Sequence, residues 1–392
     1  MTYDFESLRS DVLRTRPGAK WAKARPGDGL AAWVADMDFA LAPPIRAALD
    51  ELIEQGDVGY PRWAPTGVSP MVEVFADRMD ARFGWNPPVD QVVELAEVVQ
   101  GIQVVLHFAT APGDGILLLT PIYPPFLSCG GFGGRHTVEV AARRDGDGWA
   151  WDRDEVATAA GRTRAMLLCH PHNPLGRVYE RDELEFLAEL AERHDLLIIS
   201  DEIHADLVYA PGGHIPMSSL SAHTAARTVT ITSTSKAFNL AGLRWAIAHV
   251  GPAELRAALA DLPSHLLGVP NLAAVTASRA AWTESDDWLA AVVGHLDTQR
   301  HRLAALTAAR LPAIDYVRPE ATYLAWLDCR RLALVDEPYN VFAAAGVELS
   351  PGPNFGDAGR GFVRLNLATS SAVLDEIVDR VADAVATAPS VG

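Results

Sequence analysis

Residues 228–236 read Thr228-Val229-Thr230-Ile231-Thr232 and then Ser233-Thr234-Ser235-Lys236, an apolar β-branched run that ends on hydroxyl side chains and a lysine. Such a run predicts a buried strand. Three similar runs precede it, at 115–120, 165–169 and 196–200. The segment 181–194, between the second and third runs, has the apolar spacing of a helix. Strands that alternate with helices predict a mostly parallel sheet covered on both faces.

The chain of 392 residues is too long for one ordinary domain. We expect a large α/β domain at 46–285 and a smaller α+β domain at 286–392, with residues 1–45 as an N-terminal segment of the small domain. The elements expected after residue 286 are a helix at 288–311, strands at 321–327 and 362–367, and a final helix at 374–385.

Composition narrows the class of protein. A chain with a formal net charge of −17 lacks the basic surface of a nucleic-acid binder. No stretch approaches the roughly 20 apolar residues of a membrane-spanning helix, and residues 1–10 lack the pattern of a secretory signal. The chain has three cysteines, an odd number, which lie far apart at Cys129, Cys169 and Cys329. Such free thiols suit a reducing compartment. We therefore expect a cytoplasmic enzyme with no nucleic acid or membrane partner.

Lysine is rare in this chain. Of 33 basic residues only three are lysines, at Lys20, Lys23 and Lys236. Arginine stays protonated in proteins, whereas a lysine can become a neutral amine nucleophile. Lys236 is therefore a candidate for chemistry that arginine cannot perform.

Polar residues follow each of the four predicted strands. Tyr123, Asn173, Asp201 and Lys236 all come shortly after an apolar run. Ligands of open parallel sheets bind at the carboxyl ends of the strands. These four side chains are therefore predicted to meet in one site.

Two other kinds of site fit less well. His170, His172, Asp201, Glu202 and His204 are zinc-ligand types, but their spacing is not that of a zinc site, and no metal is expected. Ser233-x-x-Lys236 matches one motif of the serine acyl-transferases. The companion motif needs a later lysine, which the chain lacks.

A site for pyridoxal 5′-phosphate explains more of the pattern. Lys236 would form a Schiff base with the cofactor aldehyde, and Asp201 would keep the pyridine nitrogen protonated. Tyr123 offers a flat partner for the ring. A helix start offers N–H groups to a phosphate, and a hydroxyl and a guanidinium would add to them. The residues expected to hold the phosphate are Gly101, Ile102, Gln103, Ser233 and Arg244.

Several motifs in register resemble one known family. Asn173-Pro174 with Gly176, then Asp201, Ser233-x-x-Lys236 and Arg364, are similar to fold-type I pyridoxal-phosphate enzymes of the class I/II aminotransferase superfamily. Four longer motifs resemble its MalY/PatB-like cystathionine β-lyase branch, and the likeness runs from about residue 30 to 370. These motifs lie at Trp33–Phe39, Pro171–Pro174, Asp201–Asp206 and Lys236–Leu243.

The resemblance implies a role for each matching residue. Lys236 would bind the cofactor and act as acid and base at Cα. Asn173 would hydrogen-bond the ring hydroxyl, and Arg364 would bind the substrate α-carboxylate. Tyr60 would reach the phosphate of the neighbouring subunit, which implies a homodimer. His204 stands near the ring oxygen, with core packing an equal alternative.

The resemblance predicts a carbon–sulfur β-lyase that acts on cystathionine or a related cysteine conjugate. An aminotransferase, or a biosynthetic variant acting on a cysteine thioconjugate, shares the same residues and stays open, as does a regulatory side role. Two positions depart from the branch: His170 and Leu175 stand where asparagine and threonine are expected.

Overall fold

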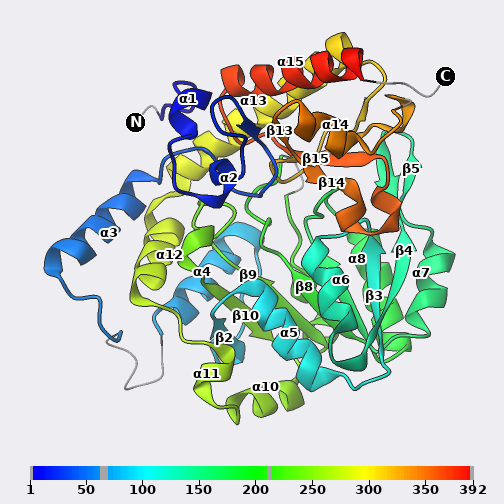
Figure 1. The fold of residues 1–392 in the computed structure, drawn as a ribbon. Coiled ribbons are helices and arrows are strands. Elements are labelled where there is room, and N and C mark those ends of the chain that lie inside the picture. Colours follow the sequence, from blue (N-terminus) through cyan, green and yellow to red (C-terminus); the bar gives the residue numbers. More distant parts are fainter. Residues whose placement is uncertain (1–2, 62–68, 210–212, 333, 389–392) are drawn as a thin grey trace.

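The computed structural model describes residues 3–61, 69–209, 213–332 and 334–388. Its centre is a seven-stranded sheet, drawn in Figure 1 with helices on both sides. The strands, in their order across the sheet, are β2 (Val92–Leu95), β10 (Ala246–Val250), β9 (Thr228–Thr232), β8 (Leu197–Asp201), β7 (Ala165–Cys169), β3 (Gly115–Thr120) and β4 (His136–Ala141). All neighbours pair in parallel except those of β10, which is antiparallel to both β2 and β9.

Apolar side chains point alternately to the two faces of the sheet along each strand, which explains why both faces are covered. In β3, Ile116 and Leu118 pack in one core cluster and Leu117 and Leu119 in another, because successive strand side chains point to opposite faces. The first cluster includes side chains of α5 (Val98–Ala109), α6 (Pro124–Gly131) and α10 (Ala253–Ala260), and the second includes those of α7 (Arg153–Ala160) and α8 (Arg181–Arg193).

The C-terminal part is built around a smaller antiparallel sheet. Its strand order is β11 (Asp315–Tyr316), β12 (Leu324–Asp328), β15 (Phe362–Asn366) and β14 (Ser350–Pro351). Helices α13 (Asp286–Arg310), α14 (Pro338–Ala344) and α15 (Ser371–Thr387) lie around it (Figure 1). Strand β1 (Leu30–Ala31) pairs in parallel with β13 (Val347–Glu348), which joins the N-terminal segment to this part.

The remaining helices include three longer ones, α3 (Pro43–Gln55), α4 (Met71–Phe83) and α12 (Leu272–Glu284). The short elements are α1 (Ser10–Leu13), α2 (Ala19–Ala22), α9 (Ala222–Ala225), α11 (Ser264–Leu267), β5 (Arg143–Asp145) and β6 (Gly148–Ala150). Figure 1 shows α3 projecting from the side of the molecule. Among the described residues, no helix has both the length and the apolar character that crossing a bilayer requires.

The mostly parallel α/β sheet and the smaller α+β part agree with the predicted fold class. Two details differ from expectation. Strand β12 begins at Leu324 rather than residue 321, because Thr322 has a φ of +69°, outside the strand region. The antiparallel β10 gave no distinct signal, since five buried apolar residues suit either direction.

Candidate active site

The carboxyl ends of the parallel strands surround one cavity, as the order of polar residues predicts. Tyr123, Asn173, Asp201 and Lys236 all line it, although they follow four different strands. The other lining residues are Ala35, Glu97, Val98, Val99, Cys169, Ile203, His204, Ser235, Ala241, Arg244 and Trp245.

Lys236 lies in the turn that follows β9, and its side chain is half-buried. The Nζ atom donates a hydrogen bond of 2.9 Å to the Ala35 carbonyl. Burial lowers the pKa of the Lys236 amine, although the Asp36 charge acts in the opposite direction. The lysine can therefore supply a neutral amine more readily than one in water.

Asp201 is the last residue of β8 and is almost fully buried. Burial raises the pKa of its carboxyl to about 7, more than the N–H of Ile203 and the charge of Lys236 lower it. The Ile203 N–H donates to Asp201 Oδ1 at 3.1 Å. The neighbouring Glu202 is used elsewhere, because its Oε2 lies 2.7 Å from His214 Nε2. Of these two neighbouring carboxylates, Asp201 is the one that lines the cavity.

Arg364 projects from the middle of β15 and is linked to the strand ends through Asn173. Its Nη1 donates to Asn173 Oδ1 at 2.9 Å, and its Nη2 donates to the Trp33 carbonyl at 2.7 Å and to Ser350 Oγ at 3.1 Å. Its Nε is buried without a hydrogen-bond partner among the described residues. Burial lowers the pKa of Arg364 to about 10. A buried cation with an unused donor suits an anionic ligand.

Gly101, Ile102 and Gln103 are not at a helix start, and this prediction is corrected. Helix α5 begins at Val98, so the Gly101 N–H already donates to the Glu97 carbonyl at 3.0 Å. Only the N–H groups of the first turn lack partners within a helix. The residues of this turn that line the cavity are Glu97, Val98 and Val99.

Ser233 and Arg244 are the two side chains expected to complete a phosphate site, and only Arg244 lines the cavity. Ser233 Oγ donates to the Trp245 carbonyl at 2.6 Å, and Ser235, two residues further on, lines the cavity instead. Arg244 lines the cavity, is largely exposed and forms an ion pair with Glu97. Arg244 has a φ of +55°, which directs the chain sharply after the short turn at Ala241–Leu243.

Three further residues line the cavity. Tyr123 precedes α6, and burial raises the pKa of its phenol. His204 is buried, its Nδ1 has no partner among the described residues, and burial lowers its pKa to about 3. The ring is therefore neutral. Cys169 is buried and also lines the cavity.

Tyr60 lies apart from this cavity. Its side chain is 96% exposed, shortly after α3. The two residues that depart from the family motif are buried. His170 Nε2 is 3.0 Å from the Ile215 carbonyl, and the His170 ring centre is 4.3 Å from that of His214.

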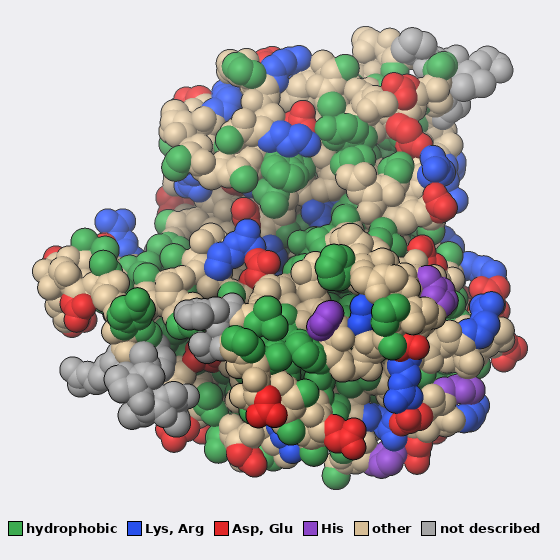
Figure 2. Space-filling view, turned by 60° about the horizontal axis from the view of Figure 1, so that its bottom comes forward, with side chains coloured by type: hydrophobic (Ala, Val, Ile, Leu, Met, Phe, Trp, Pro, Cys, Tyr) green, Lys and Arg blue, Asp and Glu red, His purple; other side chains and the backbone are tan. Residues whose placement is uncertain are grey.

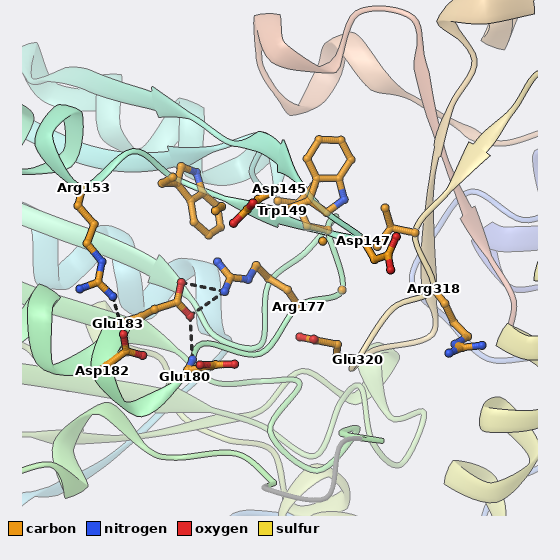
Figure 3. A pocket seen from close by; sticks show the side chains of 16 residues that line it. Asp145, Asp147, Trp149, Arg153, Arg177, Glu180, Asp182, Glu183, Arg318 and Glu320 are labelled. Atoms are coloured by element: carbon orange, nitrogen blue, oxygen red, sulfur yellow. Dashed lines mark hydrogen bonds and ion pairs between the residues drawn. The ribbon is translucent and has the colours of Figure 1, made fainter.

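Leu175 lines a second cavity, together with Arg177 and Glu183 (Figure 3). Here Arg177 donates two hydrogen bonds to Glu183, at 2.6 and 2.8 Å. The Gly176 carbonyl accepts the N–H groups of Glu320 and Ala321 from the C-terminal part of the chain. These bonds hold the Asn173 turn against that part.

Sequence reasoning missed the contribution of Ala35, whose carbonyl contacts the lysine. Its signal was available, because Ala35 lies inside the Trp33–Phe39 motif. The cavity thus offers an amine, a buried carboxyl group and an aromatic ring, and Arg364, which has an unused donor, is linked to it through Asn173. These groups fit the aldehyde, the ring nitrogen, the ring face and the substrate carboxylate of a pyridoxal-phosphate site.

Comparison with known proteins gives consistent matches. Residues 88–381 match the family model described as aminotransferase class I and II. The cystathionine β-lyase PatB of Bacillus subtilis is 33% identical, over 95% of this chain and 97% of the relative. The cystathionine β-lyase of Corynebacterium glutamicum is also 33% identical, over 95% of this chain and 98% of the relative.

Solved structures agree with these matches. The pyridoxal-phosphate-bound carbon–sulfur lyase of Staphylococcus hominis superposes with a TM-score of 0.89 at 26% identity, and the match covers 98% of each chain.

Proposed function

The chain belongs to the class I and II aminotransferase family, and we propose that it is a carbon–sulfur β-lyase that uses pyridoxal 5′-phosphate. The proposed substrate is cystathionine or a related S-substituted cysteine. The observation that carries the proposal is the Lys236 side chain, which lines the same cavity as Asp201 and Asn173. The names of the matched relatives support elimination over transamination.

Lys236 both attaches the cofactor and moves the proton. A neutral amine is needed for nucleophilic attack, and the lowered pKa of the Lys236 amine supplies it. When bound, pyridoxal phosphate supplies an aldehyde that condenses with amines and a ring that withdraws electrons from the substrate Cα. The freed Lys236 amine then removes the Cα proton, a step that acid–base placement accelerates about 10²–10⁴-fold.

Asp201 holds a proton at the ring nitrogen. Its carboxyl is buried and, among the described residues, Oδ1 accepts the Ile203 N–H, so the other oxygen would be available to the ring. A carboxylate in such a dry site pairs strongly with a protonated nitrogen. Tyr123 lines the same cavity and would cover the ring face.

Arg364 and Asn173 position the substrate. The 2.9 Å bond between them fixes the guanidinium relative to the cavity. A guanidinium binds a carboxylate through two parallel hydrogen bonds, which sets the orientation of the substrate Cα. The Cα proton is thereby presented to the lysine.

In the proposed elimination, the Cα–H and Cβ–S bonds break. The Lys236 amine takes the Cα proton, and the thiolate leaves with the Cβ–S electron pair and is then protonated. The three-carbon product hydrolyses to pyruvate and ammonia. The same residues would serve transamination, in which an oxoacid acceptor is required.

An assay with L-cystathionine separates the two reactions. We expect pyruvate and free thiol from the purified holoenzyme without any oxoacid. Product formation that depends strictly on added 2-oxoglutarate would instead identify an aminotransferase.

The Lys236→Ala variant tests the site itself. We expect it to lose the yellow absorbance of the lysine-bound cofactor and more than about 10³-fold of the turnover. Lys23→Ala is a matched control, because Lys23 pairs with Glu348 away from the cavity. Full absorbance and turnover in Lys236→Ala would overturn the assignment.

We also propose a homodimer in which Tyr60 completes the partner's phosphate site. Its almost complete exposure supports this, since a tyrosine usually buries its ring. Ile53 and Val58 are also exposed nearby. The face drawn in Figure 2 shows apolar side chains gathered beside the projecting arm of α3.

We further propose a cytoplasmic location and the division into a domain at 46–285 and a small domain formed by 1–45 and 286–392. The three cysteines are free and buried, which supports a reducing compartment. The pairing of β1 with β13 supports the assignment of the N-terminal segment.

A further inference from the structure

The Ala35 carbonyl accepts two hydrogen bonds, and only one of them comes from Lys236. Lys236 Nζ donates at 2.9 Å, and Tyr323 Oη donates at 2.8 Å. A carbonyl oxygen has two lone pairs, so both of its acceptor positions are occupied. Tyr323 is therefore joined to the lysine amine through a single oxygen atom.

This carbonyl belongs to a segment whose main chain is held by side chains. All seven carbonyls of residues 33–39 accept a hydrogen bond from a side chain. The donors are Arg364 and Ser350 to residue 33, Asn366 to 34 and 36, Lys236 and Tyr323 to 35, Lys20 to 36, Asn239 to 37 and 39, and Arg16 to 38. Such a segment has little freedom to rotate the Ala35 carbonyl.

Tyr323 is itself rigidly placed. It is fully buried at the start of β12, and its carbonyl accepts the Leu367 N–H at 2.9 Å. The preceding Thr322 has a φ of +69°, a strained conformation for a β-branched residue. Strain of this kind persists where the surroundings enforce it, often beside a functional site.

We propose that Tyr323 is a positioning residue that shares the Ala35 carbonyl with Lys236 and holds the lysine amine in its reacting position. This inference rests on the proposed role of Lys236. A neutral amine that donates one N–H to Ala35 keeps its lone pair free for the Cα proton. The Tyr323 hydroxyl fixes the acceptor and, by occupying its second lone pair, limits how strongly it can retain the charged amine.

The groups that face Lys236 define what the test must hold constant. Asp36 and Asp201 favour its charged form, and Arg364 and Arg244 favour its neutral form. Tyr323→Phe changes none of these charges and keeps the ring. Any effect on the amine then comes from the lost hydroxyl.

The three lysines of the chain make the amine directly observable. We would label the lysine side chains with ¹³C at Cε and ¹⁵N at Nζ and titrate the cofactor-free protein by NMR, with Lys236→Ala to assign the signal. In Tyr323→Phe, we expect about three- to tenfold less neutral Lys236 amine at a given pH, as one hydrogen bond of ordinary strength implies. Lys20 and Lys23 are internal references and should not shift.

Two kinetic readouts accompany the titration. The rate at which cofactor-free protein gains yellow absorbance on mixing with pyridoxal phosphate should fall three- to tenfold, in proportion to the neutral amine. In the holoenzyme, kcat should fall about five- to tenfold with KM changed less than twofold, because Arg364 and Asn173 are untouched.

Tyr209→Phe is the matched control. Tyr209 Oη donates to the Thr322 carbonyl at 2.5 Å, so this variant loses the same kind of bond in the same turn without touching Ala35. Equal titration of Lys236 in the two variants, or in Tyr323→Phe and wild type, would overturn the inference.

A second variant covers the case in which Tyr323→Phe does not fold. Site-specific 3-fluorotyrosine at position 323 keeps the ring and makes the hydroxyl a stronger donor, so the neutral fraction of Lys236 should rise. No rise would also overturn the inference. Failure of the proposed function would look different, because Lys236→Ala would then keep the yellow absorbance.

Discussion

Replacing Asp201 by asparagine should stabilise the cofactor-free protein at neutral pH while it disables the enzyme. Burial raises the pKa of this carboxyl from 3.8 to about 7. A shift of roughly three pKa units corresponds to about 4 kcal/mol lost from the free energy of unfolding when the group is charged. Burying the new amide without full hydrogen bonding costs about 2 kcal/mol. The net gain expected at pH 8 is therefore about 2 kcal/mol.

The sign of this effect depends on pH. Between about pH 4 and 7, the folded protein keeps the Asp201 proton while the unfolded chain releases it, so the wild type loses stability as pH rises. The asparagine variant does not take part in this loss. Near pH 4 the variant should be the less stable protein by about 2 kcal/mol, and the two curves should cross before neutrality.

Urea unfolding of the two cofactor-free proteins at pH 4.5, 6 and 8 measures the difference. The Glu202 charge also raises the pKa of Asp201, so the replacement removes this repulsion as well. Asp357→Asn is a suitable control, because the Asp357 side chain is 96% exposed, and it should show no pH-dependent difference. A stability difference between Asp201→Asn and wild type that is the same at all three pH values would refute the reasoning.

At neutral pH, cofactor binding should reverse the order of stability of wild type and Asp201→Asn. A protonated ring nitrogen beside Asp201 compensates the buried charge, so pyridoxal phosphate should raise the Tm of the wild type more than that of the variant. Activity of Asp201→Asn should fall at least about 10²-fold, because the ring nitrogen loses its carboxylate partner.

Three further predictions concern binding. Arg364→Lys should lower kcat/KM for cystathionine about 30- to 100-fold, mainly through KM, because an ammonium cannot form the two parallel bonds of a guanidinium; an unchanged KM would contradict this. Glu97→Gln should tighten pyridoxal phosphate binding about three- to tenfold, measured by absorbance titration, because Arg244 is released from its ion pair, and weaker binding would count against Arg244 as a phosphate ligand. Tyr60→Phe should weaken cofactor binding about fivefold at protein concentrations where dimers form, and an equal loss in dilute monomer would exclude contact across the interface.

The sequence allowed the centre of the site to be predicted because its residues follow apolar runs of uniform character. Asp201 and Lys236 come at or just after β8 and β9, and parallel pairing of these strands brings their ends together. The distant Arg364 was identified through a family motif and not through periodicity. Its position depends on β15, which only tertiary packing brings next to Asn173.

The parts that could not be predicted depend on main-chain detail. The start of α5 at Val98 was hidden because two valines fit a strand end as well as a first helical turn. Glu97 has an extended backbone there but gives no side-chain cap that a sequence pattern would reveal. Likewise, the sequence around Thr322 gives no sign of its positive φ, which only the surrounding contacts enforce.

One physical cause, burial, acts in opposite directions on Lys236 and Asp201, the two groups proposed to carry the chemistry. It lowers the pKa of Lys236 and raises that of Asp201, so the pair that would be fully charged in water is moved toward its neutral forms. The neutral form of an amine is the one that attacks an aldehyde. A carboxylate shielded from water is stabilised more strongly by an added ring cation than one in water would be. The free energy that burial costs the cofactor-free protein is therefore recovered when the cofactor binds, which explains why the same residues limit stability and enable function.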